Sequence, residues 1–131
     1  MGRRAQDRKL PGVSEETATE TEISPERAAE LIETGALLVD VRRPYEWEAG
    51  HIPGATHIEI NDLAENAESV PRDQPVVFYC RSGSRSALAA AAFRQAGWQA
   101  YNLDGGLFDW VARGHELDPP DGRVAAPKPG S

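Results

Sequence analysis

The chain contains one cysteine, Cys80, and the five residues that follow it are small, polar or cationic. A cysteine reacts as the thiolate, and nearby cations or a helix N-terminus lower its pKa and stabilise that form. Successive backbone N–H groups of a tight loop can also point inward and bind an anion. The pattern therefore favours a reactive thiolate over an inert buried thiol. The residues expected to surround it are Arg81, Ser82, Gly83, Ser84 and Arg85.

Apolar runs and helical patterns alternate along residues 23–118 and indicate how this loop is positioned. We expect strands at 36–41, 55–60, 75–80 and 99–103, and helices at 25–34, 44–49, 61–68, 84–96 and 107–113. This alternation with short connections predicts a parallel α/β sheet covered by helices on both faces. Ligands of such sheets bind beyond the carboxyl ends of the strands, which is where Cys80 is expected to lie.

Length and charge limit the classes of function. The chain has 131 residues, enough for one domain, and its formal net charge of −7 argues against a general binder of nucleic acid or of an anionic membrane. One cysteine cannot form an internal disulfide or a Cys-rich zinc site. The first residues include arginines but no apolar stretch behind them, so we expect no signal peptide and a cytoplasmic location, where a lone thiol stays reduced.

The two ends of the chain differ in composition from the middle. Residues 1–22 hold almost no large apolar side chains, and residues 119–131 contain four prolines. Segments of this kind bury too little apolar surface to offset the entropy of ordering. We therefore expect a domain at 23–118 between a disordered polar N-terminal tail and a disordered Pro-rich C-terminal tail.

Three segments resemble the single-domain rhodaneses, the thiosulfate sulfurtransferases: DVRRPYEWEAGHIPGA (40–55), CRSGSRS (80–86) and LDGGLFDW (103–110). The resemblance implies a five-stranded parallel sheet flanked by helices and a catalytic cysteine, Cys80, opening a six-residue loop. It also implies that Cys80 takes the sulfane sulfur of thiosulfate and passes it from a persulfide to cyanide, a thiol or a protein acceptor. No cofactor or metal is expected, and the chain is expected to act as a monomer or weak homodimer.

Several more residues are expected to support the loop. Asp40 and Arg42 end an apolar run, where either a buried ion pair or one solvent-facing charge would fit, and Glu46 is assigned to the same network. His51 lies in a Gly- and Pro-rich turn, so we expect it to bind backbone rather than act as a general base. Gly105–Gly106 would let another backbone approach closely.

The sequence also leaves room for functions besides enzymatic sulfur transfer. A cysteine phosphatase or arsenate reductase would use a similar loop, but its arginine stands six residues after the cysteine, where this chain has Ser86, and Arg85 comes one position earlier. The shorter loop favours sulfur transfer over phosphoryl transfer. A non-enzymatic sulfur carrier or a regulatory protein-interaction module would fit the same resemblance, and the intact Cys80 loop disfavours the regulatory module.

Overall fold

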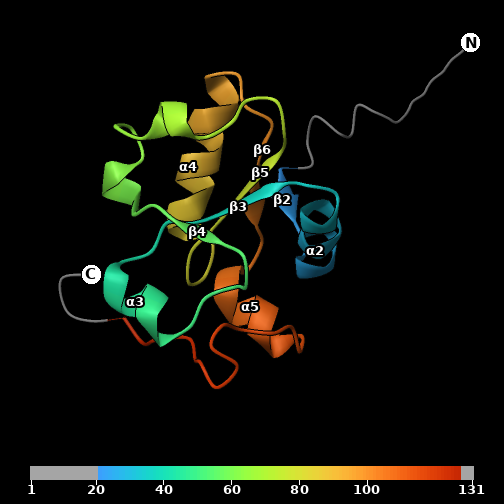
Figure 1. Ribbon diagram of the computed structural model, residues 1–131, viewed down its shortest axis with the longest axis vertical. Coiled ribbons are helices and arrows are strands. Elements are labelled where there is room, and N and C mark those ends of the chain that lie inside the picture. Colours follow the sequence, from blue (N-terminus) through green and yellow to red (C-terminus); the bar gives the residue numbers. More distant parts are fainter. Residues whose placement is uncertain (1–20, 128–131) are drawn as a thin grey trace, which may run out of the picture.

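The computed structural model describes residues 21–127, which form a five-stranded parallel sheet with the order β2-β6-β5-β3-β4. The strands are β2 (Glu22–Ile23), β3 (Leu37–Asp40), β4 (Thr56–His57), β5 (Val76–Tyr79) and β6 (Ala100–Leu103). The helices are α2 (Pro25–Glu33), α3 (Pro44–Ala49), α4 (Ser84–Gln95) and α5 (Gly106–Ala112), with 3₁₀ turns η2 (Ile60–Asp62) and η3 (Ala67–Ser69). Figure 1 shows α2 and α4 on opposite sides of the sheet. The predicted fold class is confirmed.

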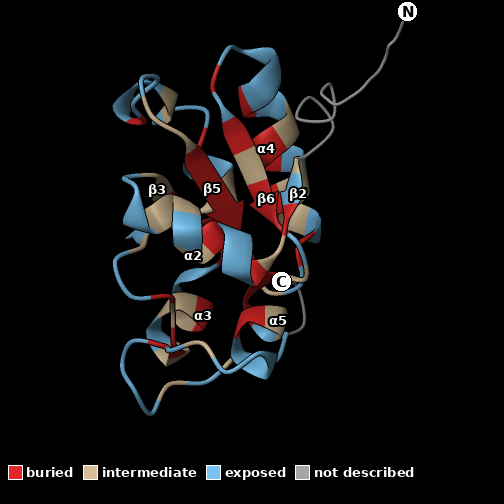
Figure 2. Cartoon of the chain, turned by 90° about the vertical axis from the view of Figure 1, so that its right-hand side faces the viewer, coloured by how far each residue is buried: buried red, intermediate tan, exposed pale blue. Residues whose placement is uncertain are grey.

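The sheet separates two hydrophobic clusters, and β5 contributes to both of them. Phe78 packs with the aromatic rings beneath α4, where its ring centroid lies 4.8 Å from that of Phe93. Tyr79 faces the other cluster, together with Leu107 and Trp110 of α5. Every residue of β5 is buried, as its colour in Figure 2 shows. The loop after this strand is therefore anchored at the centre of the fold.

Local sequence signals explain where α2 begins. Ser24 caps the helix, its hydroxyl oxygen accepting a hydrogen bond of 3.1 Å from the Arg27 N–H. Pro25 occupies the first turn, where its missing N–H costs nothing. The helix expected at 25–34 forms within one residue of its predicted end.

The region after β4 differs from the prediction. The strand expected at 55–60 is limited to Thr56–His57, and the helix expected at 61–68 is replaced by η2 and η3. Two polar side chains in this region bind backbone carbonyl groups: Asn66 Nδ2 donates to the Asp62 oxygen at 2.8 Å, and Ser69 Oγ donates to the Asn66 oxygen at 2.6 Å. Such local bonds compete with the backbone hydrogen bonds of an α-helix.

The boundaries of the domain also differ. Residues 1–20 and 128–131 lie outside the described residues, but Glu22 pairs with Asn102 in β2, so the sheet begins before residue 23. Residues 119–127, which we call the C-terminal segment, belong to the tail that the sequence predicts to be disordered, and they contact the domain through backbone hydrogen bonds. The Arg123 N–H of this segment donates to the Ala49 oxygen at 2.9 Å. Composition did not reveal this packing because backbone hydrogen bonds make part of it, and the apolar side chains that add to it, Val124 and Ala125, are few and small.

None of the helices within residues 21–127 has the length and apolar character needed to cross a bilayer.

Candidate active site

Cys80 directly follows β5, and its side chain is enclosed by the loop that leads into α4. Its sulfur accepts hydrogen bonds from the N–H of Gly83 at 3.1 Å, from the N–H of Ser86 at 3.5 Å and from the Ser86 hydroxyl at 3.3 Å. Gly83 adopts a φ of +104°, a left-handed conformation that glycine accepts readily, and α4 begins at the next residue. The loop thus directs donors at a single buried sulfur atom.

Opposing effects act on the ionisation of Cys80. Burial raises the pKa of the thiol, but the hydrogen bonds from Ser86 and Gly83 and the positive charge of Arg85 outweigh it and hold the pKa below its ordinary value. A lowered pKa enlarges the fraction of thiolate, which is the nucleophilic form. The site therefore favours a nucleophilic sulfur.

The N-terminus of α5 fixes the backbone of the loop. The Leu107 N–H donates to the Cys80 oxygen at 2.8 Å, and the Phe108 N–H donates to the Arg81 oxygen at 3.0 Å. Gly106, with a φ of +62°, makes this approach possible, because a Cβ there would lie 2.6 Å from both carbonyl oxygens. The close approach expected at Gly105–Gly106 is present, and it holds two loop carbonyls through backbone bonds.

A second group of polar contacts lies behind the sulfur. Ser86 Oγ lies 2.5 Å from Asn102 Oδ1, and Asn102 Nδ2 donates to the Gly83 oxygen at 3.1 Å and to Glu22 Oε1 at 2.8 Å. The sequence analysis used Ser86 only as the residue that stands six positions after Cys80, and it did not assign Asn102 to the site. The sequence does contain a feature that points to Asn102: a polar side chain within the apolar run of β6 needs buried hydrogen-bond partners.

Arg85 is paired with Glu46. Its guanidinium makes two hydrogen bonds to the carboxylate, of 3.0 and 3.1 Å, and Glu46 also accepts from the Arg43 N–H at 3.0 Å. Burial raises the pKa of Glu46, but the bonds from Arg85 and Arg43 outweigh this effect and lower it. The direct hydrogen-bond partners of Glu46 are Arg85 and the backbone of Arg43, and the positive charge of Arg42 also helps to lower the pKa of its carboxyl.

Asp40 and Arg42 form a buried ion pair, the first of the two alternatives that the sequence left open. Arg42 Nη2 lies 2.7 Å from Asp40 Oδ2 and also donates to the Gly50 oxygen at 2.8 Å. This pair joins the end of β3 to the residue that follows α3. His51 has a backbone contact, as expected, with Nδ1 3.0 Å from the Trp47 oxygen, and its ring stacks on that of Trp47.

Arg81 points along the outside of the loop. Its Nε donates to the Ala125 oxygen at 3.1 Å, and its guanidinium carbon lies 5.7 Å from the centre of the Phe108 ring. A pocket of about 200 Å³ opens beside the loop. It is lined by Glu46, Arg81, Ser82, Ser84, Arg85 and Pro127.

The structure thus brings all five residues from Arg81 to Arg85 around Cys80 or into the adjoining pocket, and it keeps Asp40, Arg42 and His51 in bracing positions. Among residues 21–127, no three His, Cys, Asp or Glu side chains are grouped so that they could hold a metal ion.

Comparisons with known proteins identify the family. A family model described as the rhodanese-like domain matches residues 24–113. The thiosulfate sulfurtransferase GlpE of Pseudomonas aeruginosa (strain LESB58) is 42% identical over 89 residues, which is 67% of this chain and 81% of that protein. A rhodanese-related protein from Thermoplasma volcanium has a similar structure, with a TM-score of 0.69 and 29% identity over 73% of this chain and 95% of its own.

A protein of unknown function from Rhodopseudomonas palustris CGA009, described as a possible tyrosine phosphatase, is also similar in structure. It gives a TM-score of 0.64 at 27% identity and covers 85% of this chain and 89% of its own. The family match and the identity to GlpE together show that this chain belongs to the rhodanese family, a family of sulfurtransferases.

Proposed function

We propose that this protein is a sulfurtransferase that takes the sulfane sulfur of thiosulfate, or of a similar donor, and holds it as a persulfide on Cys80. The observation that carries the proposal is the enclosure of the Cys80 sulfur by three hydrogen bonds from Gly83 and Ser86. GlpE, to which this chain is similar, is named a thiosulfate sulfurtransferase. That similarity supports thiosulfate as the donor.

The chemistry proceeds in two displacements. The Cys80 thiolate attacks the outer sulfur of thiosulfate, a sulfur–sulfur bond forms to Cys80, and the bond to the inner sulfur breaks as sulfite leaves with its electron pair. A nucleophilic acceptor then attacks the terminal sulfur and releases the Cys80 thiolate. With cyanide the product is thiocyanate. A covalent intermediate of this kind predicts ping-pong kinetics.

The loop supplies the electrostatic stabilisation that these steps require. The N–H groups of Gly83 and Ser86 are fixed on the Cys80 sulfur, so they stabilise the negative charge of the attacking and of the departing Cys80 thiolate without reorganising. Arg81 and Arg85 border the pocket through which an anionic donor would approach. Arg85 is held by two hydrogen bonds to the Glu46 carboxylate. We therefore assign the attraction of the anionic donor chiefly to Arg81, and we assign to Arg85 the shaping of the loop.

A cysteine phosphatase or arsenate reductase is the second candidate, because a thiolate in an anion-binding loop serves those reactions too. The position six residues after Cys80 belongs to Ser86, whose N–H donates to the sulfur and whose hydroxyl contacts both the sulfur and Asn102. A loop that closes on one sulfur atom leaves little room for the three oxygens of a bound phosphate. This geometry favours sulfur transfer.

The test compares two reactions of the full-length protein. The protein should form thiocyanate readily from thiosulfate and cyanide, and its hydrolysis of an aryl phosphate should be negligible. A sulfur carrier would form the persulfide with thiosulfate but release thiocyanate slowly. Faster phosphate hydrolysis, by a wide margin, would overturn the proposal.

The physiological acceptor is proposed to be a thiol or a protein, and the reduced thiol that the mechanism needs fits a cytoplasmic location.

A further inference from the structure

We propose that the C-terminal segment forms a wall of the substrate pocket and restricts the sulfur donors and acceptors of Cys80 to small molecules, namely inorganic sulfur anions, cyanide and low-molecular-weight thiols. This inference rests on the proposed sulfurtransferase function and narrows its acceptor class. The segment lies beyond residues 24–113, the part of the chain that matches the family.

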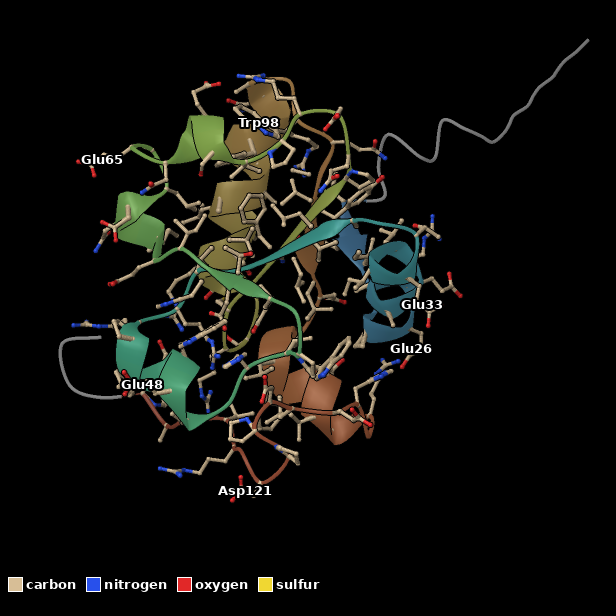
Figure 3. All side chains as sticks on the ribbon, viewed as in Figure 1. Glu26, Glu33, Glu48, Glu65, Trp98 and Asp121 are labelled. Carbon is tan, nitrogen blue, oxygen red and sulfur yellow. The ribbon has the colours of Figure 1, made fainter. Side chains whose placement is uncertain are left out.

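Backbone contacts hold the segment against the end of α3. His51 and Asp118 exchange two backbone hydrogen bonds, of 3.1 and 2.7 Å, just before the segment begins. The Arg123 N–H then donates to the Ala49 oxygen, and a Cβ on Gly50 would lie only 2.8 Å from the Arg123 nitrogen and oxygen. Figure 1 shows this red part of the chain running below α5 towards α3, and Figure 3 places Asp121 at the same end of the molecule.

The far end of the segment reaches the pocket itself. The Ala125 oxygen accepts the bond from Arg81 Nε, Ala125 is buried, and the Tyr45 hydroxyl donates to the Ala126 oxygen at 3.4 Å. Pro127 lines the pocket opposite residues of the Cys80 loop. The segment thus fixes Arg81 and supplies one side of the pocket.

The size of the pocket limits the size of the molecules that can reach Cys80. Its volume of about 200 Å³ is smaller than the roughly 300–1,000 Å³ typical of sites for drug-sized ligands. The Cys80 side chain is fully buried beneath the loop whose residues Arg81, Ser82, Ser84 and Arg85 line this pocket. A small anion or the end of a small thiol fits this space, whereas a cysteine on a folded protein would meet Pro127 and its neighbours first.

The experiment measures how access to Cys80 depends on the size of the reagent. A chain ending at Asp118 lacks the C-terminal segment but keeps the pairing with His51, and a chain ending at Pro127 is the matched control. Alkylation of Cys80 by iodoacetamide is compared with alkylation by a polyethylene glycol maleimide. Sulfur transfer from thiosulfate to cyanide is compared with transfer to reduced thioredoxin, used as a protein thiol.

We expect the chain ending at Asp118 to react with the large maleimide and with thioredoxin at least tenfold faster than the control, while iodoacetamide and cyanide change by less than about threefold. Gly50→Ala provides a second variant that keeps every residue of the segment. Its Cβ would push the Arg123 backbone away, so it should shift the ratio of large to small reagents in the same direction.

An unchanged ratio in both variants would overturn the proposal. If the shortened chain does not fold, the ratio in Gly50→Ala decides. Failure of the full-length protein to form thiocyanate would overturn the proposed function instead, and the alkylation ratio would still report whether the segment limits access.

Discussion

The hydroxyl of Ser86 lies 2.5 Å from the side-chain oxygen of Asn102, closer than the 3.3 Å that separates it from the Cys80 sulfur. A hydroxyl has one proton to donate, so Asn102 and Cys80 compete for it. The N–H groups of Gly83 and Ser86 are fixed donors to the sulfur by comparison. The hydroxyl therefore stabilises the thiolate only while its proton is directed at Cys80 rather than at Asn102.

Replacing Ser86 tests this balance. In Ser86→Ala the two backbone N–H donors remain, and the loss of one hydrogen bond to a charged group should reduce alkylation of Cys80 at neutral pH by about tenfold. The pH dependence of the alkylation rate should move to higher pH, because the hydroxyl lowers the pKa of Cys80. Ser69→Ala, on exposed η3, is the matched control. An unchanged profile would show that the hydroxyl proton stays with Asn102.

Gly106→Ala tests the docking of α5 on the loop. A Cβ at this position would lie 2.6 Å from the Cys80 and Arg81 oxygens, so the loop or the helix must move. Because displacements of about 1 Å can cost a catalytic site about a hundredfold in rate, we expect a loss of that order in thiocyanate formation. Gly114→Ala is the control: Gly114 also has a positive φ, of +87°, but its Cβ would meet no atom within 4 Å. Equal losses in both variants would mean that backbone strain, not the contact with the loop, is responsible.

Glu46→Gln tests the buried pair with Arg85. The pKa of Glu46 is lowered in the folded state, so its contribution to stability is complete above the ordinary glutamate pKa of about 4.3 and is lost as the pH falls through the folded-state value. We expect the variant to lose about 1–3 kcal/mol of unfolding free energy at neutral pH. The difference from the native protein should shrink as the medium becomes more acidic.

Urea denaturation at several pH values measures this difference. Glu48→Gln is the matched control, since Glu48 lies exposed on the same helix and projects outward in Figure 3. A difference that stays constant from neutral to acidic pH would contradict the ionised pair.

Arg81→Gln tests the attraction of the donor. The amide keeps a hydrogen-bond donor but removes the charge, and losing a charge-assisted contact should raise KM for thiosulfate by about tenfold. The dependence on cyanide should change less, because the second step begins from the persulfide. Arg27→Ala, an exposed change on α2, is the control. Unchanged kinetics with thiosulfate would mean that Arg81 does not attract the donor and serves only to bind the Ala125 oxygen.

The sequence was sufficient to predict the position of Cys80 in the fold. An apolar run that ends at Cys80, followed by RSGSR and a helical pattern, predicts a cysteine at the carboxyl end of a buried strand, and the structure has it there. The need for Gly106 was likewise predictable as a close approach of two backbones. The position of Cys80 depends on residues that are near one another in the chain, and the Gly105–Gly106 pair itself signals the close approach, although Cys80 and Arg81 are distant in sequence.

The missed contacts join residues far apart in the chain. Arg85 and Glu46 are separated by 39 positions, and Asn102 and Glu22 by 80. Neither periodicity nor composition reports which polar side chains meet across elements. The C-terminal segment was missed for a different reason, because backbone groups near Arg123 and Ala125 hold it, and every residue type except proline carries the same N–H.

The most direct test of the persulfide mechanism is the intact mass of the full-length protein after exposure to thiosulfate, with excess reagent removed. We predict a gain equal to one sulfur atom, located on Cys80, that disappears when cyanide is added and thiocyanate forms. Cys80→Ser should show no gain and no turnover. Thiocyanate formation by Cys80→Ser, or turnover by the native protein with no sulfur ever found on Cys80, would contradict the mechanism.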